Sequence, residues 1–235
     1  MLDTHLHVYA TDLRAYPRAA GGASPPSEPA EAADYLAAAR RAGIEKAVLV
    51  QPSAYAGDTR YIRRVADEHP EVFRFVVIAA YRDDDGPAAL ERECDHPRMR
   101  GGRFNLTADN RPPETLAGDP ALLRTLTVLA GRGRVADLHV NSGGLGLAAE
   151  LATRFPETPF IVDHMGYPEP GGYPDGAYAD AVRRLASLGN VYFKLSGFEM
   201  KSRTGFPFAD MTEYAAFILE TAGSRRCMWG SNYPF

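Results

Sequence analysis

Eight short β-rich segments alternate with seven helical segments along the 235 residues of the chain. The expected strands cover residues 2–7, 47–51, 73–79, 101–105, 136–141, 160–164, 191–196 and 227–231, and the expected helices cover residues 30–42, 58–68, 86–94, 119–131, 144–155, 177–188 and 211–222. Strands that alternate with helices form parallel sheets with helical crossovers. Eight such strands in a chain of this length predict one α/β domain over residues 1–235, a (β/α)8 TIM barrel.

An open, doubly wound sheet is the alternative fold. Such sheets usually have fewer strands and a glycine-rich first turn, and no G-x-G-x-x-G pattern follows the first expected strand. The sequence stops at Phe235, just after the eighth strand, so we expect a barrel without its final helix. Either the chain is truncated at its C-terminus or another subunit covers the gap, and the second case would make the protein a homo-oligomer.

The lengths of the connecting segments orient the barrel. The links from helix to strand are short, as at Gly43, whereas four links from strand to helix are long and cover residues 9–29, 106–118, 165–176 and 198–210. In TIM barrels the active site lies at the face formed by the strand-to-helix loops. The carboxyl ends of the strands therefore mark the functional end.

Charge and composition exclude several classes of function. The net charge is −4 and no basic run is present, which argues against nucleic-acid binding. No apolar stretch approaches the roughly 20 residues of a membrane span, and no signal peptide is visible. The two cysteines, Cys94 and Cys227, match no metal or redox spacing and indicate reduced thiols in a cytoplasmic protein. The expected partner is a small-molecule substrate.

Four of the six histidines lie at the carboxyl ends of expected strands: His5, His7, His139 and His164. His5 and His7 are two residues apart, so on a strand they share one face and lie roughly 6.5–7 Å apart. Imidazole is the commonest ligand of zinc and similar ions. Three histidines and a water form a competent hydrolytic site, because the metal lowers the pKa of the water. The alternative is that these histidines are separately hydrogen-bonded at the barrel rim.

Further polar residues occupy the same end. Asn232 ends the eighth strand, where a carboxylate would be the obvious general base; asparagine cannot accept a proton, but it can orient a water or offer a carbonyl oxygen to a metal. Arg103 and Asn105 share a face of the fourth strand, and arginine binds a carboxylate through two parallel hydrogen bonds. Gln51 would add a polar contact at the second strand.

The remaining candidates are less specific. Asp163 neighbours His164, so strand alternation predicts that it faces away from the barrel lumen. Several side chains of the long loops could line the mouth of the site: Arg111, Tyr167, Tyr173, Lys201 and Arg203.

The chain resembles the amidohydrolase superfamily, in particular the lactonase branch of the amidohydrolase-2 group. The motifs that carry the resemblance are Asp3-Thr4-His5-Leu6-His7, Val50-Gln51-Pro52-Ser53, Gly102-Arg103-Phe104-Asn105, Asp163-His164-Met165-Gly166 and Trp229-Gly230-Ser231-Asn232-Tyr233-Pro234. The branch includes 2-pyrone-4,6-dicarboxylate lactonase and sugar lactonases.

This resemblance implies roles for individual residues. His5, His7 and His139 would bind a divalent metal ion, with zinc favoured, or in metal-free members the substrate carbonyl. His164 would assist catalysis or bind substrate, and Arg103 would bind a substrate carboxylate. The family usually has aspartate at the position of Asn232.

Three functions follow from the residues and the resemblance together. The first is hydrolysis of a small lactone, carboxylate-bearing or sugar-derived, by histidine- or metal-assisted attack of water. The second is metal-dependent decarboxylation of an aromatic or enol carboxylate. The third is a catalytically impaired binding protein, because Asn232 replaces the usual aspartate.

Overall fold

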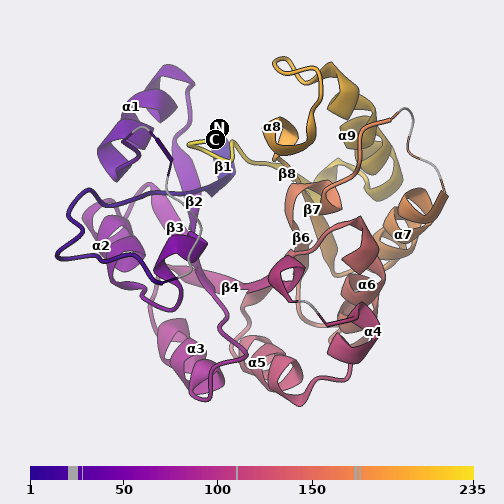
Figure 1. Cartoon of the computed structure of the whole chain (residues 1–235), viewed down its shortest axis with the longest axis horizontal. Coiled ribbons are helices and arrows are strands. Elements are labelled where there is room, and N and C mark those ends of the chain that lie inside the picture. Colours follow the sequence, from indigo (N-terminus) through magenta and orange to yellow (C-terminus); the bar gives the residue numbers. More distant parts are fainter. Residues whose placement is uncertain (21–25, 28, 110, 172–173, 175) are drawn as a thin grey trace.

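A single parallel sheet curls into a nearly closed barrel, which confirms the TIM-barrel prediction (Figure 1). This computed structural model describes residues 1–20, 26–27, 29–109, 111–171, 174 and 176–235. The strands are β1 (Leu2–Leu6), β2 (Lys46–Val50), β3 (Phe73–Ile78), β4 (Met99–Asn105), β5 (Val135–His139), β6 (Phe160–Val162), β7 (Val191–Leu195) and β8 (Cys227–Trp229). Each strand pairs with the next one along the chain, so their carboxyl ends lie at one rim.

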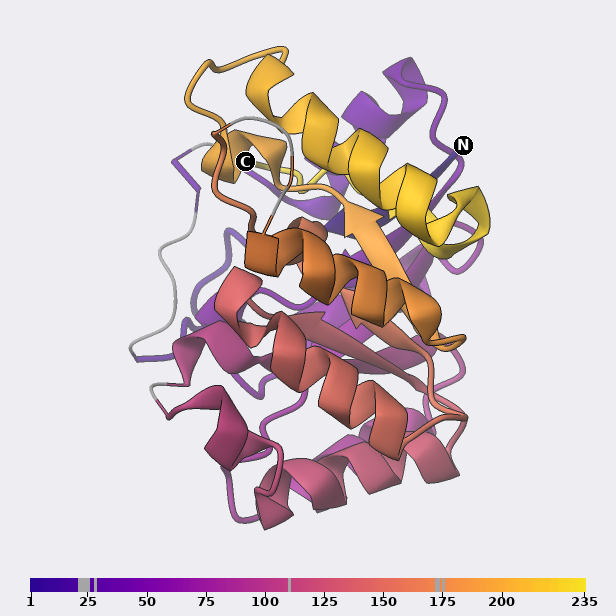
Figure 2. The same cartoon turned by 90° about the vertical axis from the view of Figure 1, so that its right-hand side faces the viewer.

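Helices surround the barrel on its outer side (Figures 1 and 2). Those in the described ranges are α1 (Ala32–Arg41), α2 (Arg60–Glu68), α3 (Gly86–Cys94), α4 (Pro113–Leu116), α5 (Pro120–Gly131), α6 (Leu145–Arg154), α7 (Gly176–Ser187), α8 (Phe198–Lys201) and α9 (Ala209–Ala222). The seven expected helices are all present. The short helices α4 and α8 fall inside two of the long loops and were not predicted. None of the described helices has the length and apolar composition that a membrane span requires.

Local sequence signals set these elements. Helix α5 begins after Asp119, whose side chain accepts hydrogen bonds from the backbone N–H groups of Ala121 and Leu122. Pro120 at the first helical position needs no partner for a backbone donor. Strands β1 to β7 are mostly buried on both faces, as parallel barrel strands require, whereas β8 is only partly buried and its Trp229 is exposed.

The barrel closes between the two ends of the sequence. The segment after β8 runs beside β1: the His7 N–H donates to the Tyr233 carbonyl (2.8 Å), and the Asn232 N–H donates to the His5 carbonyl (2.8 Å). As expected, no helix follows β8 within the part of the chain that the structure describes.

Asp3 joins the two sides of this seam. Its fully buried carboxylate accepts hydrogen bonds from the backbone N–H groups of His5 (3.1 Å) and Ser231 (3.0 Å), from the Ser231 hydroxyl (2.6 Å) and from the Tyr35 hydroxyl (3.0 Å). The carboxylate thus fixes β1, α1 and the segment after β8 to one another, directly below His5.

We expect Asp3→Ala to lower the free energy of unfolding by about 3 kcal/mol, because several buried donors lose their acceptor. The matched control is Asp180→Ala, which removes an exposed carboxylate paired with Arg183 and should change stability by less than about 0.5 kcal/mol. Urea denaturation measures both. Equal effects in the two variants would contradict this role of Asp3.

Candidate active site

The four predicted rim histidines come together at the carboxyl end of the barrel. The Nε2 atoms of His5 and His7 are 3.3 Å apart. The ring centroids of His5 and His164 are 4.4 Å apart, and those of His139 and His164 are 6.2 Å apart. His5, His7 and His164 are buried, and His139 is partly buried. The cluster therefore draws on β1, β5 and the turn after β6.

Two glycines allow this close packing. A Cβ atom at Gly230 would lie 2.6 Å from Cβ of His5, and a Cβ atom at Gly197 would lie 2.6 Å from Nδ1 of His164. Gly197 also has a φ of +70°, a left-handed conformation that favours glycine. The segments after β7 and β8 reach the histidines only because these positions carry no side chain.

Neighbouring groups orient each imidazole. Nδ1 of His7 lies 2.7 Å from the Val50 carbonyl, and because a carbonyl can only accept, this nitrogen carries the ring proton and leaves Nε2 bare. Nδ1 of His164 lies 2.9 Å from the Ser196 hydroxyl. His139 is held by two hydroxyls, with Thr107 at Nδ1 (2.8 Å) and Tyr167 at Nε2 (2.6 Å).

The histidines are neutral at neutral pH. Burial, followed by the positive charge of Arg103, lowers the pKa of both His7 and His139 to about 3. Burial likewise holds the pKa values of His5 and His164 well below their ordinary range. Neutral imidazoles can donate or accept hydrogen bonds and can bind a metal ion.

Asp163 is the main correction to the sequence prediction, because it faces into the barrel. Strand β6 ends at Val162, and a 3₁₀ turn at Asp163–Gly166 places His164 at a φ of 51°. The strand was expected to reach His164 but ends two residues earlier, so the alternation on which the prediction rested does not apply to Asp163. The Asp163 carboxylate receives the Nε–H of Arg103 at 2.8 Å and lies 3.2 Å from Nδ1 of His5.

Sequence reasoning also missed Lys194 and Asp137. The Lys194 ammonium, 2% exposed, lies 2.5 Å from Asp137, 2.9 Å from Asp163 and 3.1 Å from Nδ1 of His5. Burial opposes its charge, but the two carboxylates outweigh burial and raise the pKa of Lys194. A lone charged residue in each of the apolar strands Val191–Leu195 and Val135–His139 was the available signal.

Arg103 and Asn105 differ in burial and in their hydrogen-bond partners. Arg103 is buried, its Nε is committed to Asp163, and no described residue accepts a hydrogen bond from its two Nη atoms. Asn105 is only partly buried, and its Oδ1 has no hydrogen-bond partner. Both side chains therefore keep polar atoms that a ligand could engage.

Gln51 does not fit the substrate contact expected from the sequence. Its Nε2 donates to the carbonyls of Ala56 (2.6 Å) and Asp58 (3.2 Å), and its Oε1 accepts from the Ile78 N–H (3.1 Å). These main-chain contacts occupy both ends of the amide. Gln51 thus links the loop after β2 to strand β3, and these contacts give it a structural role.

Asn232 is held at the rim by Glu199 of helix α8. Its side-chain Nδ2 donates to Oε1 of Glu199 at 2.5 Å, and its backbone adopts a φ of 53°, which asparagine tolerates better than most residues. Sequence analysis missed Glu199, because the helix that presents it was not predicted. The site therefore contains a carboxylate beside the asparagine.

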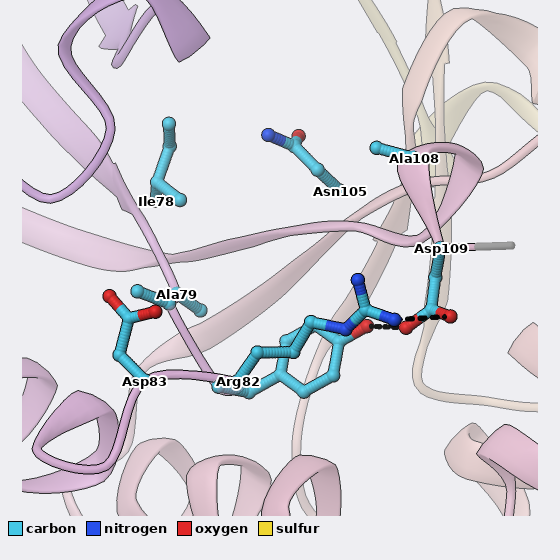
Figure 3. A pocket seen from close by; sticks show the side chains of 9 residues that line it. Ile78, Ala79, Arg82, Asp83, Asn105, Ala108 and Asp109 are labelled. Atoms are coloured by element: carbon cyan, nitrogen blue, oxygen red, sulfur yellow. Dashed lines mark hydrogen bonds and ion pairs between the residues drawn. The ribbon is translucent and has the colours of Figure 1, made fainter. Parts of the chain in front are cut away.

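A pocket of about 190 Å³ lies at the carboxyl ends of β3 and β4, and Figure 3 shows the side chains that line it. Asn105 and Ile78 contribute to one part of its wall, and Arg82, paired with Asp109 at 2.9 Å, contributes to another. The histidines do not line this pocket. The pocket is formed by the ends of β3 and β4 and by the segments that follow these two strands.

The other loop candidates are dispersed. Tyr167 contacts His139, Lys201 pairs with Glu169, Arg111 pairs with Asp109 and Asp119, and Arg203 lines a separate pocket near Asp210. Tyr173 lies outside the described residues.

The donor atoms of the cluster are suited to a divalent ion. Two zinc ligands in a tetrahedral site are roughly 3.3 Å apart, as the Nε2 atoms of His5 and His7 are. His5, Asp163 and His164 also offer ligand atoms within 4.8 Å of one another. This group differs from the predicted set, because His139 has both ring nitrogens engaged by hydroxyls.

Because the buried histidines are neutral, we expect the stability of the folded protein to fall at acidic pH. A histidine whose pKa is lowered on folding stabilises the protein above pH 6.5 and loses that contribution as the pH falls towards its folded value. Four histidines act in this direction, and Asp137, whose pKa burial raises to about 7, acts against them. We expect the free energy of unfolding to fall between pH 7 and pH 5, with about 2 kcal/mol of the loss due to His7. Urea denaturation of His7→Gln should show a correspondingly shallower pH dependence; an unchanged one would contradict the assignment.

Comparison with known proteins shows the family to which the chain belongs. A family model described as Amidohydrolase matches residues 2–235. The chain is 31% identical to a 4-sulfomuconolactone hydrolase from Rhizobium radiobacter, covering 99% of this chain and 75% of the relative. A Pseudomonas putida structure, assigned as a 2-pyrone-4,6-dicarboxylic acid hydrolase, aligns with a TM-score of 0.80 at 27% identity and coverage of 99% and 82%. An amidohydrolase from Burkholderia multivorans with bound zinc shares the fold, with a TM-score of 0.82, 21% identity and coverage of 99% and 84%. The chain therefore belongs to the amidohydrolase family.

Proposed function

We propose that the protein hydrolyses a small lactone that carries a carboxylate. The observation that carries this proposal is the buried Arg103 beside the His5–His7 pair: no described residue accepts from the Nη donors of the guanidinium, and the imidazole pair can contact a carbonyl oxygen. Arginine binds carboxylates in a two-point geometry. The named lactone and pyrone hydrolases among the similar proteins support the same reaction class.

Glu199 is the proposed general base. Asn232 donates to Oε1 of Glu199, which leaves Oε2 able to take a proton from water. The water oxygen bonds to the lactone carbonyl carbon, and the resulting oxyanion accepts a hydrogen bond from the histidine pair. The ring C–O bond then breaks, and Glu199 returns its proton to the leaving oxygen. A divalent ion bound by His5 and His7 would supply Lewis-acid polarisation of the carbonyl.

The substrate class is tested with a panel of lactones, carboxylate-bearing, sugar-derived and neutral. We expect ring opening of at least one carboxylate-bearing lactone, and Arg103→Lys should raise its KM about tenfold or more, because lysine cannot form the paired hydrogen bonds. Arg100→Lys changes an arginine of the same strand that bonds only main-chain carbonyls, and should have little effect. Release of carbon dioxide without ring opening would instead support a decarboxylase, and binding without turnover would support a binding protein.

The role of Glu199 is tested by Glu199→Gln. We expect kcat to fall by about 10²–10⁴, because glutamine cannot accept the proton. Glu213→Gln, on the exposed side of α9, should retain full activity. A Glu199→Gln enzyme with the kcat of the parent would contradict the assignment.

A further inference from the structure

Lys194 occupies a place in the lumen that the proposed reaction does not use. It comes from the middle of β7 and is surrounded by Asp137, Asp163 and His5 at 2.5, 2.9 and 3.1 Å. An ammonium group can only donate hydrogen bonds. Where it meets a histidine nitrogen, that nitrogen must therefore accept.

The contacts of Lys194 and Val50 define one arrangement of the protons on the two histidines. Because Lys194 donates to Nδ1 of His5, the His5 proton lies on Nε2. His7 donates from Nδ1 to the Val50 carbonyl, so Nε2 of His7 is an acceptor. The two Nε2 atoms then form a matched donor and acceptor at 3.3 Å. The Lys194 ammonium at one end can only donate, and the Val50 carbonyl at the other end can only accept. Together they set the direction of donation along this series of hydrogen bonds.

His5 can also adopt the other tautomer, with its proton on Nδ1. To bind a metal through Nε2, His5 must carry its proton on Nδ1 and donate it to an acceptor there, as ligating histidines do. Asp163 Oδ1 lies 3.2 Å from that atom and can accept this proton, although it also lies 2.9 Å from the Lys194 ammonium. Lys194 and Asp163 thus favour opposite tautomers of His5.

Charge balance favours the first arrangement. Lys194 and Arg103 together match Asp137 and Asp163, so these buried charges can cancel without a divalent ion. An added ion would leave excess positive charge in a buried site, where uncompensated charge is costly.

We propose that Lys194 is a positioning residue that holds His5 in its Nε2–H tautomer, so that this N–H, which donates to His7 in the free site, can donate to a substrate oxygen instead, and His5 binds divalent ions weakly. The inference concerns the site of the proposed function but does not depend on its substrate. Both readouts below can be obtained without turnover, so a failed lactone assay would leave them interpretable.

The test compares the parent protein with Lys194→Met and with the double variant Lys194→Met/Asp137→Asn, which removes one cation and one anion together and protects the fold. Long-range ¹H–¹⁵N correlation spectra of histidine-labelled protein report the tautomer, with His5→Gln used to assign the signal. Zinc affinity is measured by competition with a chromophoric chelator. The control is Lys46→Met, at the exposed start of β2.

We expect His5 to be the Nε2–H tautomer in the parent and the Nδ1–H tautomer in the folded double variant, with zinc bound at least about tenfold more tightly by the variant. Lys46→Met should match the parent in both measurements. An Nδ1–H tautomer in the parent, or a folded double variant with unchanged tautomer and zinc affinity, would overturn the proposal.

Discussion

The buried carboxylate of Asp163 is the contact on which the rest of the site depends. Cations from two strands, Arg103 of β4 and Lys194 of β7, converge on it, and His5 of β1 lies against it. Burial opposes its ionisation, but the cations Lys194 and Arg103 hold the pKa of Asp163 well below its ordinary value. One carboxylate thereby ties three parts of the barrel together beneath the rim.

Burial keeps the four rim histidines uncharged. Since their pKa values are lowered, they are neutral and available as donors, acceptors or ligands, while the charges lie one layer deeper. The seam between β1 and β8 supports this layer, because Asp3 fixes both sides below His5. The structural and chemical roles of the first-strand motif are therefore carried by different residues: Asp3 closes the barrel, whereas His5 and His7 face the site.

The architecture and the rim histidines were predictable, because strand and helix periodicities alternate regularly and parallel strands end at a common rim. Asp163 was mispredicted because a turn with left-handed residues follows Val162 and ends the strand alternation. Glu199 was missed because it lies on a four-residue helix inside a loop, where no periodicity can be detected. The position of Gln51 depends on loop carbonyls that only the folded chain brings near it. The errors in the predicted site therefore arose at short strands and in loops, whereas the barrel itself was predicted correctly.

In the proposed complex, the histidine pair binds the carbonyl of one small lactone, and Arg103 binds the carboxylate of the same molecule. A crystal structure with the ring-opened product of an accepted lactone tests it directly. We expect one product carboxylate within hydrogen-bond distance of Nε2 of His5 or His7 and a second on the Nη atoms of Arg103. A product bound instead in the Asn105–Asp109 pocket, with the histidines and Arg103 uncontacted, would contradict it.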